Sequence, residues 1–162
     1  MKKCVFAGTF DPPTVGHEDV VRKCLKIFDE VVVALLVNPQ KNCLFSDEQR
    51  MCLLNKLFLG VKGVKVRTFS GAAVDLLKEE STPFYVRGVR DAIDFEYENR
   101  NHYASKRLMP EIISIYLPCE QNHLHVSSTL VRNSIKFSKD FADLVPSCIY
   151  ADVLAMSEDK NV

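Results

Sequence analysis

The chain has 162 residues with 21 basic and 21 acidic side chains, and this balance argues against a general binding surface for nucleic acid. The segment before Asp11 holds too few apolar residues for a signal peptide or a membrane span, so we expect a cytoplasmic protein without a membrane partner. Six scattered cysteines without a Cys-x-x-Cys pair predict reduced thiols, mostly in the core, rather than a zinc site.

Apolar strands alternate with amphipathic helices along the chain. Strands are predicted at residues 2–7, 30–37, 64–68, 84–86 and 112–117. Helices are predicted at 17–28, 46–58, 72–79, 91–107, 130–135 and 148–156. This order is typical of right-handed βαβ units. We therefore predict a single α/β domain over residues 1–162, with a Rossmann-like five-stranded parallel sheet, helices on both faces and a frayed end at 157–162.

The loop after the first strand is rich in residues that break regular structure. Pro12-Pro13 prevents a helix across its middle, and Gly16 removes a side chain where the backbone could approach a ligand. His17 then stands at the expected start of a helix, where free backbone N–H groups bind anions. Together with the Thr9 hydroxyl, this loop predicts a phosphate site with a catalytic imidazole. A tight connection whose histidine only caps the helix is the alternative.

Further polar residues follow other predicted strands. Lys41 comes after the second strand, Arg87 and Arg90 after the fourth, and Ser127-Ser128-Thr129 precedes the fifth helix. Alone, each has an ordinary explanation, such as a solvated lysine or a helix cap. Because ligands of such sheets bind beyond the carboxyl ends of the strands, we expect these groups to converge on one crevice that binds a polyphosphate.

Three segments resemble motifs of a known family. Residues 8–17, with Gly-Thr-Phe-Asp-Pro and Thr-Val-Gly-His, resemble the T/HxGH motif of the cytidylyltransferase-like nucleotidylyltransferases. Residues 85–98 resemble the RGxR…DFEYE signature of the bacterial phosphopantetheine adenylyltransferases, and residues 126–132 resemble the ISS(S/T)xxR segment of that family. The three motifs stand in the expected order and spacing, so the resemblance extends along nearly the whole chain.

The resemblance implies a reaction and its components. The adenylyl group of ATP would pass to 4′-phosphopantetheine, giving dephospho-coenzyme A and pyrophosphate, the penultimate step of coenzyme A synthesis. It also implies Mg²⁺ with the ATP, a homohexamer, and coenzyme A as a candidate feedback ligand. The attacking oxygen belongs to an ionised phosphate, so we expect in-line attack without a covalent enzyme intermediate, promoted by positioning and charge neutralisation.

The same resemblance assigns roles to individual residues. His17 would stabilise the transition state and Glu98 would lie near the ribose of ATP, with no protein ligand to a metal. The catalytic residues would be Thr9, His17, Lys41 and Arg90. The acceptor substrate would contact Thr9, Lys41, Ala73 and Arg87. ATP would contact Thr9, Phe10, His17, Gly88, Val89, Arg90, Glu98, His123, Leu124, His125, Val126, Ser127, Ser128 and Thr129.

The sequence departs from the family pattern at Ala72-Ala73, where larger residues commonly line the pantetheine arm, so we expect a roomier acceptor pocket. Three alternatives stay open. The first is a sister nucleotidylyltransferase that uses nicotinamide mononucleotide or a cytidyl donor. The second is a nucleotide-sensing module without turnover, and the third is a redox or metal protein built on the six cysteines.

Overall fold

The computed structural model describes residues 1–158 and contains one parallel sheet. Its strands lie in the order β3-β2-β1-β4-β5, and all four neighbouring pairs are parallel. The strands are β1 (Lys3–Gly8), β2 (Glu30–Leu36), β3 (Val64–Phe69), β4 (Phe84–Val89) and β5 (Ile113–Pro118). The predicted five-stranded parallel sheet of a Rossmann-like α/β fold is confirmed.

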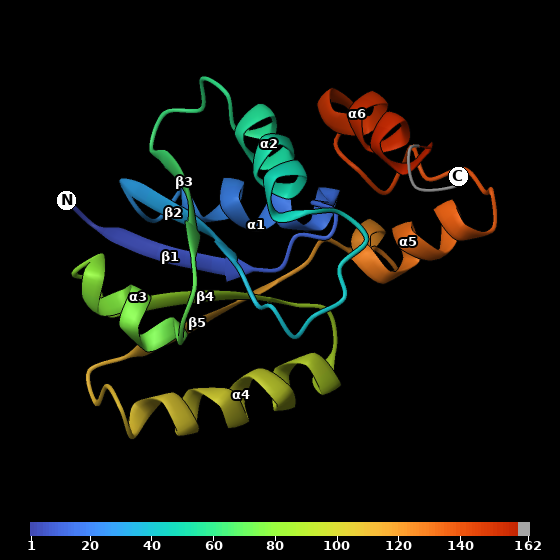
Figure 1. The fold of residues 1–162 in the computed structure, drawn as a ribbon. Coiled ribbons are helices and arrows are strands. Elements are labelled where there is room, and N and C mark those ends of the chain that lie inside the picture. Colours follow the sequence, from blue (N-terminus) through green and yellow to red (C-terminus); the bar gives the residue numbers. More distant parts are fainter. Residues whose placement is uncertain (159–162) are drawn as a thin grey trace.

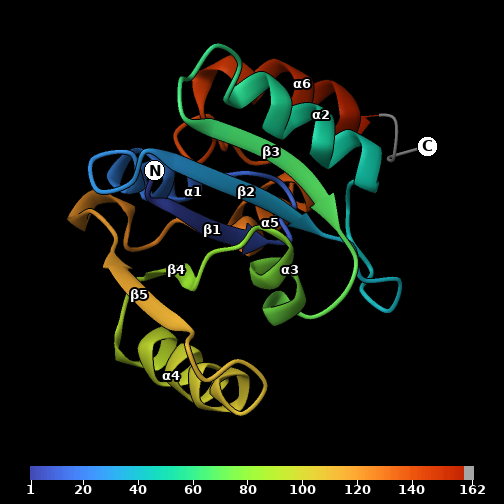
Figure 2. The ribbon, with the colours of Figure 1, turned by 90° about the vertical axis from the view of Figure 1, so that its left-hand side faces the viewer.

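Helices cover both faces of the sheet (Figure 1). In the described part of the chain, they are α1 (Val15–Cys24), α2 (Asp47–Leu57), α3 (Ala73–Glu79), α4 (Ala92–Lys106), the 3₁₀ turn η1 (Gln121–His123), α5 (Ser128–Lys136) and α6 (Ser147–Glu158). Figure 1 places α1, α2, α5 and α6 on one face and α3 and α4 on the other. Figure 2 shows α2 and α6 side by side, and the ion pair between Lys56 Nζ and Asp152 Oδ2, 2.6 Å long, joins them. The predicted arrangement of the layers is confirmed.

Strands β1 and β2 consist mainly of apolar residues, and both of their faces are covered. Val5 pairs with Val32 in register and both side chains pack toward one cluster, whereas Phe6 and Val33 pack into the other. All four side chains are at most 4% exposed. A parallel sheet buried on both faces needs such continuous apolar runs, and they made β1 and β2 visible in the sequence.

Several boundaries differ from the prediction. Helix α1 begins at Val15, because Thr14 caps it, so His17 lies in the first turn rather than at its start. Strand β4 runs to Val89 rather than ending at residue 86, because Arg87 pairs in register with Tyr116 of β5 and Val89 with Pro118. Arg87, Gly88 and Val89 are thus strand residues rather than loop residues.

The carboxyl-terminal prediction covers two kinds of residue. Ser157 and Glu158, predicted as frayed, belong to helix α6, where the Ser157 hydroxyl donates to the Leu154 carbonyl at 2.7 Å. Residues 159–162 lie outside the described residues. None of the helices within 1–158 combines the length and apolar character that a bilayer span requires.

The strand order creates the place for a site. From β1 the chain continues to β2 and β3 on one side, whereas β4 and β5 lie on the other side of β1. The connections that leave β1 and β4 therefore diverge, and a crevice opens beyond the carboxyl ends of these two strands. The loop with Thr9 and the first turn of α1 with His17 follow β1, and Arg90 follows β4, so the fold itself brings the sequence motifs together.

Candidate active site

A cavity of about 550 Å³ lies in this crevice beyond the carboxyl ends of β1 and β4. It is lined by most of the predicted site residues: Thr9, Phe10, His17, Lys41, Arg87, Gly88, Val89, Arg90, Glu98, His123, Val126, Ser127 and Ser128. Four predicted residues are not among those that line it: Ala73, Leu124, His125 and Thr129. Ala73 is the first residue of α3, and the other three flank or begin α5.

His17 is held in one orientation by the cap of its own helix. The Thr14 backbone N–H donates to His17 Nδ1 at 3.0 Å, while the Thr14 hydroxyl accepts from the His17 backbone N–H. Because Nδ1 accepts, the proton of a neutral imidazole must sit on Nε2. Burial, together with the positive charges of Arg87 and Arg90, lowers the pKa of His17 to about 4. His17 is therefore a neutral hydrogen-bond donor that also takes part in the cap of its own helix. Its catalytic role stays a prediction.

The Phe10 ring packs against the imidazole of His17. It makes an edge contact with the His17 ring at a centroid distance of 4.9 Å and another with Phe6 at 5.6 Å. The Phe10 backbone has φ of 49°, a conformation that L residues seldom adopt and that persists only where the surroundings enforce it. A Cβ atom on Gly8 would lie 3.2 Å from the Phe10 ring, so the absence of a side chain at position 8 leaves room for this ring.

Thr9 and Lys41 meet from neighbouring loops. Lys41 Nζ donates to Thr9 Oγ1 at 3.1 Å, although the two residues are 32 positions apart. The Asp11 carboxylate, which is buried, accepts from the backbone N–H groups of Leu44 at 2.8 Å and Phe45 at 2.9 Å. The segment that carries Lys41 is thereby tied to the loop that carries Thr9.

Arg87 reaches from β4 toward the end of β1 and toward α4. Its Nη1 donates to the Ala7 carbonyl and its Nη2 to Glu98 Oε1, both at 2.6 Å. Burial opposes the charge of Arg87, but Tyr85 and Glu98 outweigh it and raise the pKa of the guanidinium. Glu98, expected near a ribose, thus lines the cavity as the counterion of Arg87.

Arg90 is oriented by an acidic partner on α4. Its Nε donates to Asp94 Oδ2 at 2.8 Å, and its Nη1 donates to the Val126 carbonyl at 3.3 Å. The hydrogen bond from Arg90 lowers the pKa of Asp94, so this carboxyl group stays ionised. Gly88 lets α1 approach the strand, because a Cβ atom there would lie 2.8 Å from Val20 Cγ2.

The start of α5 closes the cavity. Ser127 caps the helix by accepting from the Leu130 backbone N–H at 3.0 Å, and the Ser128 hydroxyl donates to the Pro12 carbonyl at 2.8 Å. Arg132 Nη1 donates to the Asp11 carbonyl at 2.6 Å. Ser127 thus caps α5, and Ser128 joins the amino end of this helix to the loop after β1. Backbone N–H groups at such a helix end can bind an anion.

Sequence reasoning missed several lining residues. Asp94 and Arg132 stood inside the quoted motifs without a role, and the four-residue spacing from Arg90 to Asp94 across the start of a predicted helix was the available signal. Cys43 and Cys119 also line the cavity and are partly exposed. Cys52 and Cys148 are exposed, so the prediction of mostly buried thiols is wrong for four of the six cysteines, since these lie on outer helix faces and in loops.

Within residues 1–158, no group of three or more histidine, cysteine or acidic side chains is arranged to hold a metal ion. The carboxylates that line the cavity already have partners. Asp11 accepts from two backbone N–H groups, Asp94 pairs with Arg90 and Glu98 pairs with Arg87. A hard cation such as Mg²⁺ would therefore depend mainly on oxygen ligands brought by a bound substrate.

The chain is similar in sequence to known proteins. The family model described as Cytidylyltransferase-like matches residues 5–134. Proteins named phosphopantetheine adenylyltransferase are similar over nearly the full chain. The protein from Clostridium tetani is 36% identical over 99% of this chain and 100% of its own length. The one from Clostridium beijerinckii is 35% identical over 96% and 98%, and the one from Nautilia profundicola is 36% identical over 93% and 98%.

A solved structure supports the fold. The chain is similar to a putative nicotinate-nucleotide adenylyltransferase from Vibrio parahaemolyticus, with a TM-score of 0.66 over 96% of this chain and 99% of that one. The two sequences are 21% identical, so this likeness concerns the arrangement of strands and helices alone.

Proposed function

The chain belongs to the cytidylyltransferase-like family and, within it, to the phosphopantetheine adenylyltransferases, and on this premise we propose that it transfers the adenylyl group of ATP to 4′-phosphopantetheine. The observation that carries the proposal is that His17, Lys41, Arg87 and Arg90 all line the same cavity. The products are dephospho-coenzyme A and pyrophosphate, and the enzyme is a nucleotidyltransferase of coenzyme A synthesis.

The reaction we propose is an in-line displacement. An oxygen of the acceptor phosphate forms a bond to the α-phosphorus of ATP, while the bond from that phosphorus to the bridging oxygen of the β-phosphate breaks. Pyrophosphate takes the electron pair and leaves. The nucleophile is already ionised, so the protein supplies position and positive charge rather than a base.

We propose the following roles for residues that line the cavity. His17 donates from Nε2 to the α-phosphoryl oxygens, and a neutral imidazole with a fixed tautomer is suited to this task. Lys41 and Thr9 bind the acceptor phosphate, joined by Arg87. Arg90 and the serines at the start of α5 bind the outer phosphates of ATP.

A pyrophosphate-release assay tests the proposal. The purified protein is incubated with ATP or CTP and with 4′-phosphopantetheine, nicotinamide mononucleotide or nicotinate mononucleotide as acceptor. We expect turnover with ATP and 4′-phosphopantetheine, and dephospho-coenzyme A as the product by mass spectrometry. Turnover with a mononucleotide acceptor instead would assign the sister activity, and tight ATP binding without any turnover would assign a sensing module.

The remaining parts of the proposal concern cofactor, assembly and regulation. We propose that Mg²⁺ enters with ATP and is bound by its phosphates, because the acidic side chains of the cavity are engaged. We also propose a homohexamer, and the exposed apolar side chains on α4 support a subunit contact there, since Ile93 is 78% and Tyr97 63% exposed. Coenzyme A contains the acceptor's phosphopantetheine unit and would compete at the same cavity, and the site of action would be the cytoplasm. Sedimentation and product-inhibition measurements test assembly and feedback.

A further inference from the structure

Arg50 is a buried cation just outside the cavity. It lies on α2, and its side chain is only 3% exposed. Its Nη1 donates to the Thr9 carbonyl at 2.7 Å, its Nε donates to the Phe45 carbonyl at 3.1 Å, and its Nη2 pairs with the Asp47 carboxylate. Each guanidinium nitrogen thus has an acceptor of its own, one in the loop after β1 and two around the start of α2. Burying a guanidinium is costly, so such complete pairing indicates a defined geometric task.

Two of the three contacts join loops that carry proposed substrate ligands, and the third, to Asp47, lies within α2. The Thr9 carbonyl belongs to the loop after β1, and the Phe45 carbonyl lies at the end of the loop that carries Lys41. The Asp11 carboxylate joins the same two loops in the opposite sense, since it accepts from backbone N–H groups of the second loop. Arg50 and Asp11 therefore hold the loops together from both sides, one as donor and one as acceptor.

The distance between Thr9 and Lys41 depends on this arrangement. Lys41 is exposed, and within residues 1–158 no carboxylate lies within ion-pair distance of it. Its Nζ reaches Thr9 Oγ1 at 3.1 Å because the two loops stand at a fixed separation. A flexible lysine that starts next to its partner loses less entropy when it binds an anion than a freely moving one.

We propose that Arg50 is a positioning residue for the acceptor phosphate, acting through the backbone of Thr9 and the loop of Lys41. It touches neither substrate. The inference rests on the proposed function, because it takes Thr9 and Lys41 to be the ligands of that phosphate. Lysine cannot replace Arg50, because one ammonium group cannot serve three acceptors with the planar geometry of a guanidinium.

The first experiment compares kinetic constants of Arg50→Lys with those of the wild-type protein. We expect the KM for 4′-phosphopantetheine to rise about tenfold, while the dissociation constant for ATP, measured by calorimetry, changes by less than about twofold. Glu80→Gln, which alters a buried charge at the opposite edge of the sheet, serves as the control for general destabilisation. An equal loss of ATP and acceptor affinity in Arg50→Lys would overturn the proposal.

A double-mutant cycle with Lys41→Ala separates positioning from a merely structural role. If Arg50 acts through the Thr9–Lys41 pair, Arg50→Lys costs much less in the Lys41→Ala background than in the wild-type background, whereas additive losses contradict the proposal. Should Arg50→Lys fail to fold, Asp47→Asn provides the test, since this partner is 41% exposed and its loss frees one arm of the guanidinium. We then expect a rise of about threefold in the acceptor KM, and an unchanged KM would overturn the inference. A wild-type protein inactive with 4′-phosphopantetheine would instead refute the proposed function.

Discussion

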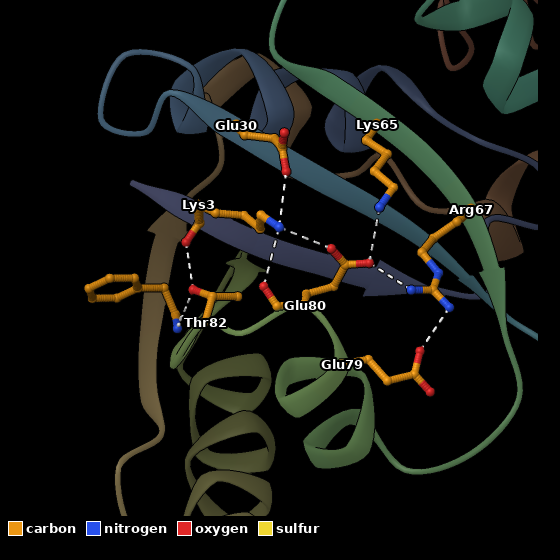
Figure 3. A network of polar contacts seen from close by, with 8 residues as sticks. Lys3, Glu30, Lys65, Arg67, Glu79, Glu80 and Thr82 are labelled. Carbon is orange, nitrogen blue, oxygen red and sulfur yellow. Dashed lines mark hydrogen bonds and ion pairs between the residues drawn. The ribbon is translucent and has the colours of Figure 1, made fainter. Parts of the chain in front are cut away.

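Two clusters of charged residues lie at opposite edges of the same sheet and use the same side chains differently. Near the amino ends of the strands, Glu80 accepts from Arg67 at 2.6 Å, from Lys3 at 3.2 Å and from Lys65 at 3.4 Å (Figure 3). Glu30 and Glu79 complete the cluster by pairing with Lys3 and Arg67. Three cations thus face three carboxylates, and Glu80 itself is only 4% exposed.

At the carboxyl edge, the charges surround a cavity instead of closing on one another. Arg87 and Arg90 each have one acidic partner, but Lys41 has only the Thr9 hydroxyl among the contacts described. A neutral His17 stands among these cations. The comparison indicates that ion pairs at the amino edge hold α3 on the sheet. At the carboxyl edge, positively charged side chains remain available to bind an anionic ligand.

The sharpest test of this comparison is His17→Ala. Loss of one preorganised donor to the transition state should lower kcat by about 10²–10³-fold. ATP binding should change little, whereas the midpoint of thermal unfolding should fall modestly, because the hydrogen bond from Thr14 and the ring contact with Phe10 are lost. Steady-state kinetics and calorimetry measure both effects. An unimpaired kcat would remove His17 from the mechanism.

The second test is Lys41→Ala. A charge-assisted hydrogen bond to a phosphate is worth about 1.5–3 kcal/mol, so we expect the KM for 4′-phosphopantetheine to rise about 10- to 100-fold. Lys62→Ala, at another exposed lysine outside both clusters, is the matched control and should behave like the wild type. A KM for the acceptor that stays constant would place its phosphate elsewhere in the cavity.

The third test concerns the amino edge. Glu80→Gln removes the charge that three cations share, and we expect a loss of about 2 kcal/mol in the free energy of unfolding with kcat/KM changed less than about twofold. Glu79→Gln is the matched control, because Glu79 is 53% exposed and its single pair with Arg67 contributes little. Chemical denaturation and the pyrophosphate assay give the two readouts.

The pH dependence of this loss has a defined sign. Burial opposes the charge of Glu80, but the hydrogen bonds from Arg67 and Lys3 outweigh it and lower the pKa of the carboxyl group below its usual 4.5. A lowered carboxyl pKa contributes stability above the unfolded value, and this stability is lost as the pH falls through the folded value. The difference between wild type and Glu80→Gln should therefore shrink below about pH 4.5. A difference that grows on acidification would contradict the ion-pair account.

The contrast between the two edges also marks what the sequence could reveal. The strands of the buried sheet were predictable because they are continuous apolar runs, and the carboxyl edge was predictable because His17, Lys41 and Arg90 each follow such a run. The amino-edge cluster was not foreseen. Lys3, Lys65 and Glu80 look like ordinary solvated charges, and only the strand register and the packing of α3 on the sheet bring them together.

Residues that act through backbone contacts were the hardest to foresee. Arg50 occupies an ordinary helix position, and its function becomes visible only when the Thr9 carbonyl, 41 residues away, lies 2.7 Å from it. The length of β4 was underestimated for a similar reason, since Gly88 interrupts the strand signal before Val89 and both residues are fixed by pairing with β5. Long-range contacts of this kind leave no local pattern.

The smallest effect we expect is an absence of titration at the carboxyl edge. Burial and the nearby charges of Arg87 and Arg90 lower the pKa of His17 to about 4, against 6.5 for the unperturbed ring. The unfolded chain therefore takes up the proton more readily than the folded one, so the free energy of unfolding falls as the pH drops from about 6.5 toward 4. Above pH 6 the ring stays neutral, and kcat should show no ionisation step of His17 between pH 6 and 8.

Titration of the His17 ring signals by NMR, assigned by comparison with His17→Ala, measures this pKa directly. A pKa near 6.5 would mean that the arginine charges do not reach the imidazole, and the cavity would then resemble the charge-matched amino edge.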